Sequence, residues 1–283
     1  MIRELDKELN WEIESKNIFT NTTSDFTTNW NQVPGYKAIS RNDSGQCLSV
    51  MKNSYSPMTN AEFLDTVSKI KEISGFQLAG FNEFKGGKKV LAFLENNRDD
   101  FYIGGHKIKD FFLLGNSFDG SSSFFQGTST ELIRCENQFS KIETLTKIRH
   151  TKSIGRKLEE YYVYLDSYFN QRGELYKTFE RAGEFKLTEE LQEKMINFVL
   201  GIKDPLRAEL STYKQNQIEM LRNNMLSEAK DLGENLWAAF NGVTKFTTHD
   251  LVSKNPTFGN VFGIQADINN KAINFVNQKL VLV

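Results

Sequence analysis

The sequence predicts an α+β fold, in which an antiparallel, hairpin-rich sheet packed with helices is followed by a mainly helical C-terminal half. Between residues 34 and 133, short apolar stretches alternate with turns rich in Gly, Asn and Asp, a pattern typical of β-hairpins. After residue 150, apolar residues recur at three- and four-residue steps, the period of an amphipathic helix. The 283 residues, 39% hydrophobic and 25% charged, can build a sizeable core.

Three hairpins are predicted from apolar runs that flank turn residues. They pair residues 36–40 with 46–51, 76–84 with 88–94, and 111–117 with 123–133. The turns between them contain Asn42-Asp43-Ser44-Gly45, Gly86-Gly87 and Phe118-Asp119-Gly120-Ser121. Asx side chains can cap turn amides, and Gly adopts the positive φ that tight turns need.

One helix is predicted within the β-rich region and several after it. Thr59 and Glu62 have the spacing of a capping box, and Gly75 ends the helical pattern that follows. The later periodic stretches predict helices over residues 154–179, 187–202, 206–227 and 232–246. The tail after residue 255 has no clear pattern.

These patterns divide the chain into four parts. Residues 1–33, rich in Asn, Thr and Ser from residue 15 onward, are expected to form an N-terminal arm or loop. Residues 34–150 form the β-rich α+β core, 151–250 the helical region and 251–283 a C-terminal tail.

Composition argues against secretion and against a membrane-spanning segment. The first residues lack the apolar core of a signal peptide, and no run of about 18 apolar residues occurs. Two cysteines, Cys47 and Cys135, are too few for a disulfide framework, and we expect both to be buried as small hydrophobic residues. The predicted location is the cytoplasm of a bacterial host.

The sequence contains no recognisable catalytic motif. The glycine pairs lack the spacing of a phosphate-binding loop, and the three histidines, His106, His150 and His249, lie far apart in sequence. A triad of Asp119, Ser121 and His150 would lack the strained turn that usually presents a nucleophilic serine. The sequence therefore predicts neither a cofactor nor covalent catalysis.

A basic segment follows the third hairpin. Between residues 141 and 157 one acid, Glu143, stands against six cations, which are Lys141, Lys147, Arg149, Lys152, Arg156 and Lys157. In a chain of net charge -1, this local excess could neutralise phosphates, although it could also be a solvated helix face. We expect Arg149, Lys152, Arg156 and Lys157 to contact phosphates, with Lys147, Arg134 and His150 as supporting candidates.

Aromatic residues accompany this basic segment. Phe118 is predicted at an exposed hairpin tip, where its ring could stack on a base. Tyr161, Tyr162, Tyr164, Tyr168 and Phe169 could also stack on bases, but their helical spacing favours packing in the core.

Several segments, in order, resemble the phage/plasmid-like protein family of unknown function (DUF932-type). They are residues 34–45, 55–57, 116–121, 134–137, 149–151 and 236–244 with His249. The family usually has His at the position of Phe118. Phenylalanine cannot replace a catalytic histidine, so this departure favours a binding or packing role of the position over a catalytic one. By element order, the family in turn resembles the single-strand annealing proteins of phage recombination systems.

The second resemblance implies a single-stranded DNA-binding and annealing protein of phage or plasmid replication and recombination, without covalent chemistry. It also implies a homo-oligomer, as a ring or filament, and partners among phage or host recombination proteins. Two alternatives stay open. One is a protein-interaction or anti-defence factor, and the other is a metal-dependent nuclease built from Asp119, Glu131, Glu136 and His150.

Overall fold

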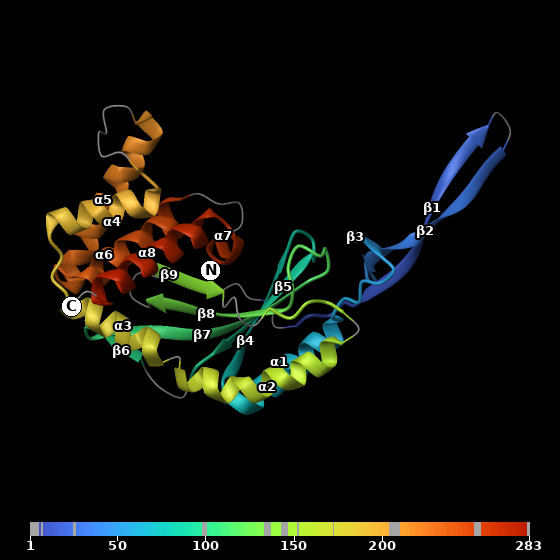
Figure 1. The fold of residues 1–283 in the computed structure, drawn as a ribbon, viewed down its shortest axis with the longest axis horizontal. Coiled ribbons are helices and arrows are strands. Elements are labelled where there is room, and N and C mark those ends of the chain that lie inside the picture. Colours follow the sequence, from blue (N-terminus) through green and yellow to red (C-terminus); the bar gives the residue numbers. More distant parts are fainter. Residues whose placement is uncertain are drawn as a thin grey trace.

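The structure, a computed structural model, confirms the α+β class: two antiparallel sheets are followed by a mainly helical C-terminal half (Figure 1). It describes residues 6, 8–24, 27–97, 101–132, 137–142, 147–151, 153–171, 173–203, 210–251 and 256–281. Within these ranges, no helix has the length and apolar character needed to cross a membrane.

The smaller sheet contains three strands in the order β1-β2-β3, with bounds β1 (Ile13–Ser24), β2 (Thr27–Arg41) and β3 (Cys47–Lys52). The β2–β3 hairpin is the first predicted hairpin, and the prediction is confirmed. The N-terminal arm is not a loop, because β1 and β2 pair along almost their whole length and project away from the body (Figure 1). The strand β2 then runs through Pro34 into the three-stranded part.

The larger sheet has the order β4-β5-β7-β8-β9, with β6 paired to β7. Its strands are β4 (Gln77–Phe84), β5 (Lys89–Glu95), β6 (Phe101–Ile103), β7 (His106–Ser117), β8 (Phe125–Leu132) and β9 (Asn137–Ile142). The pairs β4–β5 and β7–β8 confirm the other two predicted hairpins. The sequence patterns did not predict β6 and β9. The strand β6 is very short. The strand β9 carries buried polar residues, such as Asn137 and Ser140, instead of an alternating apolar pattern.

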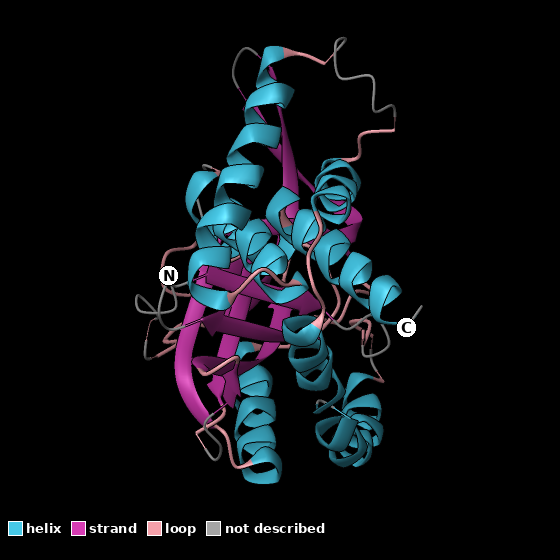
Figure 2. Ribbon diagram, turned by 90° about the vertical axis from the view of Figure 1, so that its left-hand side faces the viewer, coloured by secondary structure: helices cyan, strands magenta, loops and turns pink. Residues whose placement is uncertain are grey.

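Helices cover both faces of the larger sheet (Figure 2). Alternate residues of β5 and β7 point to opposite faces, as the pleat requires. Val90, Ala92 and Phe112 join the apolar cluster that includes α1 (Asn60–Ser74) and α2 (Ile154–Gln171). Leu91 and Phe93 join a second cluster, on the side of α7 (Pro256–Phe262). This two-sided burial explains why β5 has a continuous apolar sequence.

Two caps fix the start of α1. The predicted capping box is confirmed, because the Thr59 side chain accepts from the Glu62 amide and the Glu62 carboxylate accepts from the Thr59 amide. In addition, the Glu12 carboxylate accepts from the amides of Asn60 and Ala61, at 2.9 Å each. A carboxylate at a helix N-terminus satisfies free amides and opposes the positive end of the helix dipole. The N-terminal segment is thereby attached to α1.

The C-terminal half is helical, as predicted, but its boundaries differ. Its remaining helices are α3 (Gly173–Glu184), α4 (Glu189–Leu200), α5 (Thr212–Leu232), α6 (Leu236–Lys245), the π-helical turn η4 (Phe246–Asp250) and α8 (Ile264–Val281). The stretch predicted as one helix over residues 154–179 is divided between α2 and α3, and the tail without a clear pattern forms α7 and α8.

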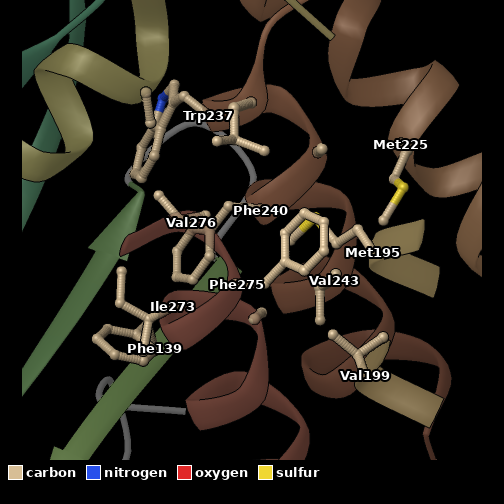
Figure 3. Packing of buried hydrophobic residues seen from close by; sticks show 14 of the residues in the cluster. Phe139, Met195, Val199, Met225, Trp237, Phe240, Val243, Ile273, Phe275 and Val276 are labelled. Atoms are coloured by element: carbon tan, nitrogen blue, oxygen red, sulfur yellow. The ribbon is translucent and has the colours of Figure 1, made fainter. Parts of the chain in front are cut away.

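The helix α6 occupies the centre of the C-terminal core. Figure 3 shows its Trp237, Phe240 and Val243 among side chains from the neighbouring helices and Phe139 of β9. Every residue from Leu236 to Thr244 is buried. The sequence signature at residues 236–244 is therefore a packing motif in this structure.

Gly242 allows α6 to pack closely on α5, and we expect Gly242→Ala to destabilise the fold. An added Cβ would lie 2.6 Å from Met225 Cα and 2.7 Å from Met225 N, and these backbone atoms cannot rotate away. The overpacking should lower the free energy of unfolding by about 1–3 kcal/mol in a denaturant titration.

Gly183→Ala in α3 is the matched control, because nothing lies within 4 Å of its Cβ position. It should be neutral or slightly stabilising, since Ala is a better helix former than Gly. Equal stabilities of the two variants would contradict this account of the α5–α6 contact.

Candidate nucleic-acid interface

Three signature segments that are far apart in the sequence meet at the end of β7. The Tyr55 hydroxyl lies 3.2 Å from the Ser117 carbonyl oxygen and 2.8 Å from His150 Nδ1. Asn116 Nδ2 donates to the Met58 carbonyl oxygen at 2.9 Å. Asn116 and Ser117 are fully buried, so this cluster is part of the interior.

His150 belongs to this buried cluster and not to the protein surface. Its side chain is 7% exposed, and burial lowers its pKa to about 4, although the negative charge of Glu62 partly opposes the shift. The imidazole is therefore neutral near pH 7. If the Tyr55 hydroxyl donates to the Ser117 carbonyl oxygen, the same hydroxyl oxygen can accept a hydrogen bond from His150. The neutral imidazole would then carry its single N–H proton on Nδ1. The expectation that His150 supports phosphate binding is wrong, because the ring is both buried and uncharged.

Phe118 is also buried, and the expectation that it stacks on a base at an exposed tip is wrong. Its side chain is 0% exposed, and its ring meets that of Trp11 edge to face at 5.5 Å. Its carbonyl oxygen accepts from Ser49 Oγ at 2.6 Å, and its amide donates to the Lys88 carbonyl oxygen at 2.9 Å. Phe118 thus connects the smaller sheet with the β4–β5 turn of the larger one.

The turn after Phe118 has the predicted chemistry. Asp119 accepts hydrogen bonds from the Ser121 amide and hydroxyl, and Gly120 has a φ of +67°. Burial alone would raise the pKa of Asp119, but the Ser121 hydrogen bonds and the charges of Lys89 and Lys85 outweigh it and lower the pKa. Asp119 is therefore an ionised capping residue.

Three residues of the nuclease alternative, Asp119, Glu131 and His150, lie within the part of the chain that the structure describes. Among the described residues, no group of three or more His, Cys, Asp and Glu side chains could hold a metal ion. Glu136, the fourth member of the proposed set, lies outside those residues.

The exposed cations flank the buried cluster. Ile148 pairs with Phe124 through two backbone hydrogen bonds of 2.9 and 3.0 Å, and its side chain is buried. Lys147 and Arg149, on either side of it, are exposed, as the alternation of an extended strand requires. The strand geometry therefore directs His150 and Ile148 inward and presents both cations to solvent.

The first turn of α2 continues this exposed basic surface. Arg156 is 76% exposed at its side chain, Lys157 is half-buried, and the turn contains no acid. Arg156 pairs with Glu160 at 4.0 Å, a distance at which an exposed ion pair contributes little. We call Lys147, Arg149, Arg156 and Lys157 the basic flank. Arg134 and Lys152, the other predicted contacts, lie outside the described residues.

The aromatic residues of α2 pack mainly against the larger sheet. Tyr161 and Tyr168 are buried, and their hydroxyls bond to Gln126 and Thr128 of β8. Packing, which the helical spacing favoured, is confirmed for these two residues. Tyr164 is 37% exposed and remains accessible.

Trp11, Arg41 and Glu83 form a cluster that the sequence patterns do not predict. Trp11 Nε1 donates to Glu83 at 2.6 Å, while the Arg41 guanidinium lies 4.0 Å from the Trp11 ring centroid and bonds to Glu83 at 2.7 Å. The Trp11–Glu83 contact spans 72 positions and the Arg41–Glu83 contact spans 42, so neither leaves a local sequence pattern. Cys47, expected to be buried, is exposed; Cys135 lies outside the described residues.

The fold and the site define an α+β protein in which the signature residues Asn116, Ser117 and His150 are buried and exposed cations lie beside them in the sequence. The chain belongs to the family described as Domain of unknown function (DUF932), which matches residues 47–262. The match covers more than half of the chain and includes the buried cluster, the basic flank and α6. No curated protein and no solved structure matches the chain.

Burial of neutral His150 predicts a loss of stability in acid. The unfolded state, with a histidine pKa near 6.5, binds more protons than the folded state, with a pKa of about 4. The stabilisation is therefore complete above about pH 6.5 and is lost as the pH falls toward 4. The free energy of unfolding should fall between pH 7 and pH 4.5 in both the wild type and His150→Gln. In denaturant titrations, the fall should be about 2 to 3 kcal/mol smaller for His150→Gln, because the variant lacks the buried histidine.

His106→Gln is the control, because His106 lies outside the buried cluster and is only partly buried. It should keep the pH dependence of the wild type. Identical pH profiles for the wild type and His150→Gln would contradict the assignment of a buried neutral His150.

Proposed function

We propose that the protein binds single-stranded DNA and promotes its annealing or protection during phage or plasmid replication and recombination, without covalent chemistry. The main support for this proposal is the grouping of four cations in the basic flank. Its four cations lie close together in sequence, two on an extended edge and two in the first turn of α2, in a chain whose net charge is -1.

The chemistry of this surface suits a phosphate backbone. Lys and Arg that neutralise phosphates release condensed counterions, which gives affinity without sequence preference. The amides in the first turn of α2, which contains Arg156 and Lys157, add the positive end of a helix dipole. Arg149 and Arg156 are the strongest candidates, since a guanidinium can bond a phosphate through two parallel donors.

The choice of single-stranded DNA rests on the resemblance to annealing proteins. Such proteins hold the strand by its backbone and leave the bases free to pair with a complement. The basic flank fits this role because it offers exposed positive charge to a phosphate backbone. Arg134 and Lys152 remain proposed contacts, and phage or host recombination proteins remain proposed partners, in the bacterial cytoplasm.

Loss of the two arginines should weaken binding and change its salt dependence. In fluorescence anisotropy with a labelled single-stranded oligonucleotide, Arg149→Ala and Arg156→Ala should each lower the affinity regardless of base sequence. Each should also reduce the slope of log affinity against log salt by about one. Duplex DNA of the same length should bind more weakly.

Lys177→Ala provides the matched control, because Lys177 is an exposed cation on α3 that pairs with Glu174 at 2.7 Å. It should leave affinity and slope unchanged. If the wild type binds no oligonucleotide at low salt, the proposal fails, and the protein-interaction alternative becomes the better one.

A further inference from the structure

The outer part of the β1–β2 hairpin, which the structure describes at residues 17–24 and 27–33, is an isolated two-stranded arm. Figure 1 shows it extending beyond β3, so that neither edge nor face is covered by the body of the molecule. A two-stranded hairpin alone is at best marginally stable in water, and stable sheets add a third strand or pack a face against another element. The arm therefore lacks the contacts that ordinarily stabilise such a hairpin.

One face of the arm carries two exposed aromatic side chains. Phe19 lies opposite Gln32, and Asn21 lies opposite Trp30. Because alternate residue pairs share a face, Phe19 and Trp30 lie on the same face, in successive pairs of that face. Phe19 is 50% exposed and Trp30 is 65% exposed. Large aromatic side chains gathered on a projecting face are typical of contact surfaces, because burying them against a partner is favourable.

The charge of the arm indicates the kind of partner. Residues 17–33 contain no Lys or Arg and a single acid, Asp25; the others are apolar or uncharged polar residues, chiefly Asn and Thr. A phosphate backbone would find no cation here, and a strongly charged protein would find no complement. In contrast, two copies of a nearly neutral surface can approach each other without like-charge repulsion, as a two-fold contact requires.

We infer that the arm is a self-association surface, on which a second copy of this chain packs its own arm. The faces that carry Phe19 and Trp30 meet across a two-fold axis and bury both aromatic side chains. This contact is independent of the basic flank and of the proposed binding to DNA.

Light scattering after size-exclusion chromatography of the full chain tests the inference. The wild type should have twice the 32.5 kDa mass of one chain, and Trp30→Asp should have the mass of one chain. Trp30 is exposed, so its replacement should not unfold the protein. The control, Tyr213→Asp on α5, replaces a side chain with a similar exposure, 67%, and should keep the wild-type mass.

Tryptophan fluorescence gives a second measurement on the unmodified protein. Trp11 and Trp237 are 6% and 4% exposed, so a water-soluble quencher such as acrylamide should report mainly on Trp30. Quenching should increase on dilution, as dimers separate and Trp30 becomes accessible.

A wild-type monomer with fully quenchable Trp30 at every concentration, or a Trp30→Asp variant with the wild-type mass, would overturn the inference. If Trp30→Asp kept the wild-type mass but lost affinity for oligonucleotides, the arm would contact nucleic acid instead of a second copy. Failure of the proposed DNA binding would appear separately, in the Arg149 and Arg156 variants.

Discussion

The contact on which the rest of the structure depends is the burial of Phe118 where the two sheets meet. Its ring packs edge to face on Trp11, and its backbone is held by Ser49 of the smaller sheet and Lys88 of the larger one. Trp11 is itself fixed by Arg41 and Glu83. A fully buried phenylalanine contributes several kcal/mol, so the turn at Phe118 holds both sheets in one arrangement.

The packing of Phe118 between the two sheets determines where the candidate interface lies. Asn116 and Ser117, which end β7 inside the core, meet Tyr55 and His150 through hydrogen bonds. Since His150 points inward, its neighbour Arg149 must face solvent, and α2 starts a few residues later. The signature residues thus act as a buried frame, and the cations beside them are the part available to a ligand. The buried residues Asn116, Ser117 and His150 therefore hold the segment from which Arg149, the proposed phosphate contact, reaches solvent.

Local patterns predicted most of the fold. The capping box at Thr59, the three hairpins and the helical C-terminal half all depend on residues close in sequence, so periodicity and turn chemistry revealed them. Long-range contacts were beyond such patterns. A hairpin tip ordinarily faces water, and distant residues such as Trp11 and Ser49 make the position of Phe118 internal. For the same reason, the charge of the segment around Arg149 was predictable, whereas the burial of His150 was not. The arm looked like a loop because its Asn- and Thr-rich strands bury no apolar face.

The most direct test of this account is to remove the Phe118 side chain and measure stability and DNA binding on the same sample. Phe118→Ala should lower the free energy of unfolding by about 3–5 kcal/mol, the usual cost of deleting a buried phenylalanine. In the fraction that remains folded, the salt dependence of oligonucleotide binding should equal that of the wild type, because the basic flank is unchanged. Wild-type stability combined with lost DNA affinity would contradict the account, since that result would mean that Phe118 contacts nucleic acid.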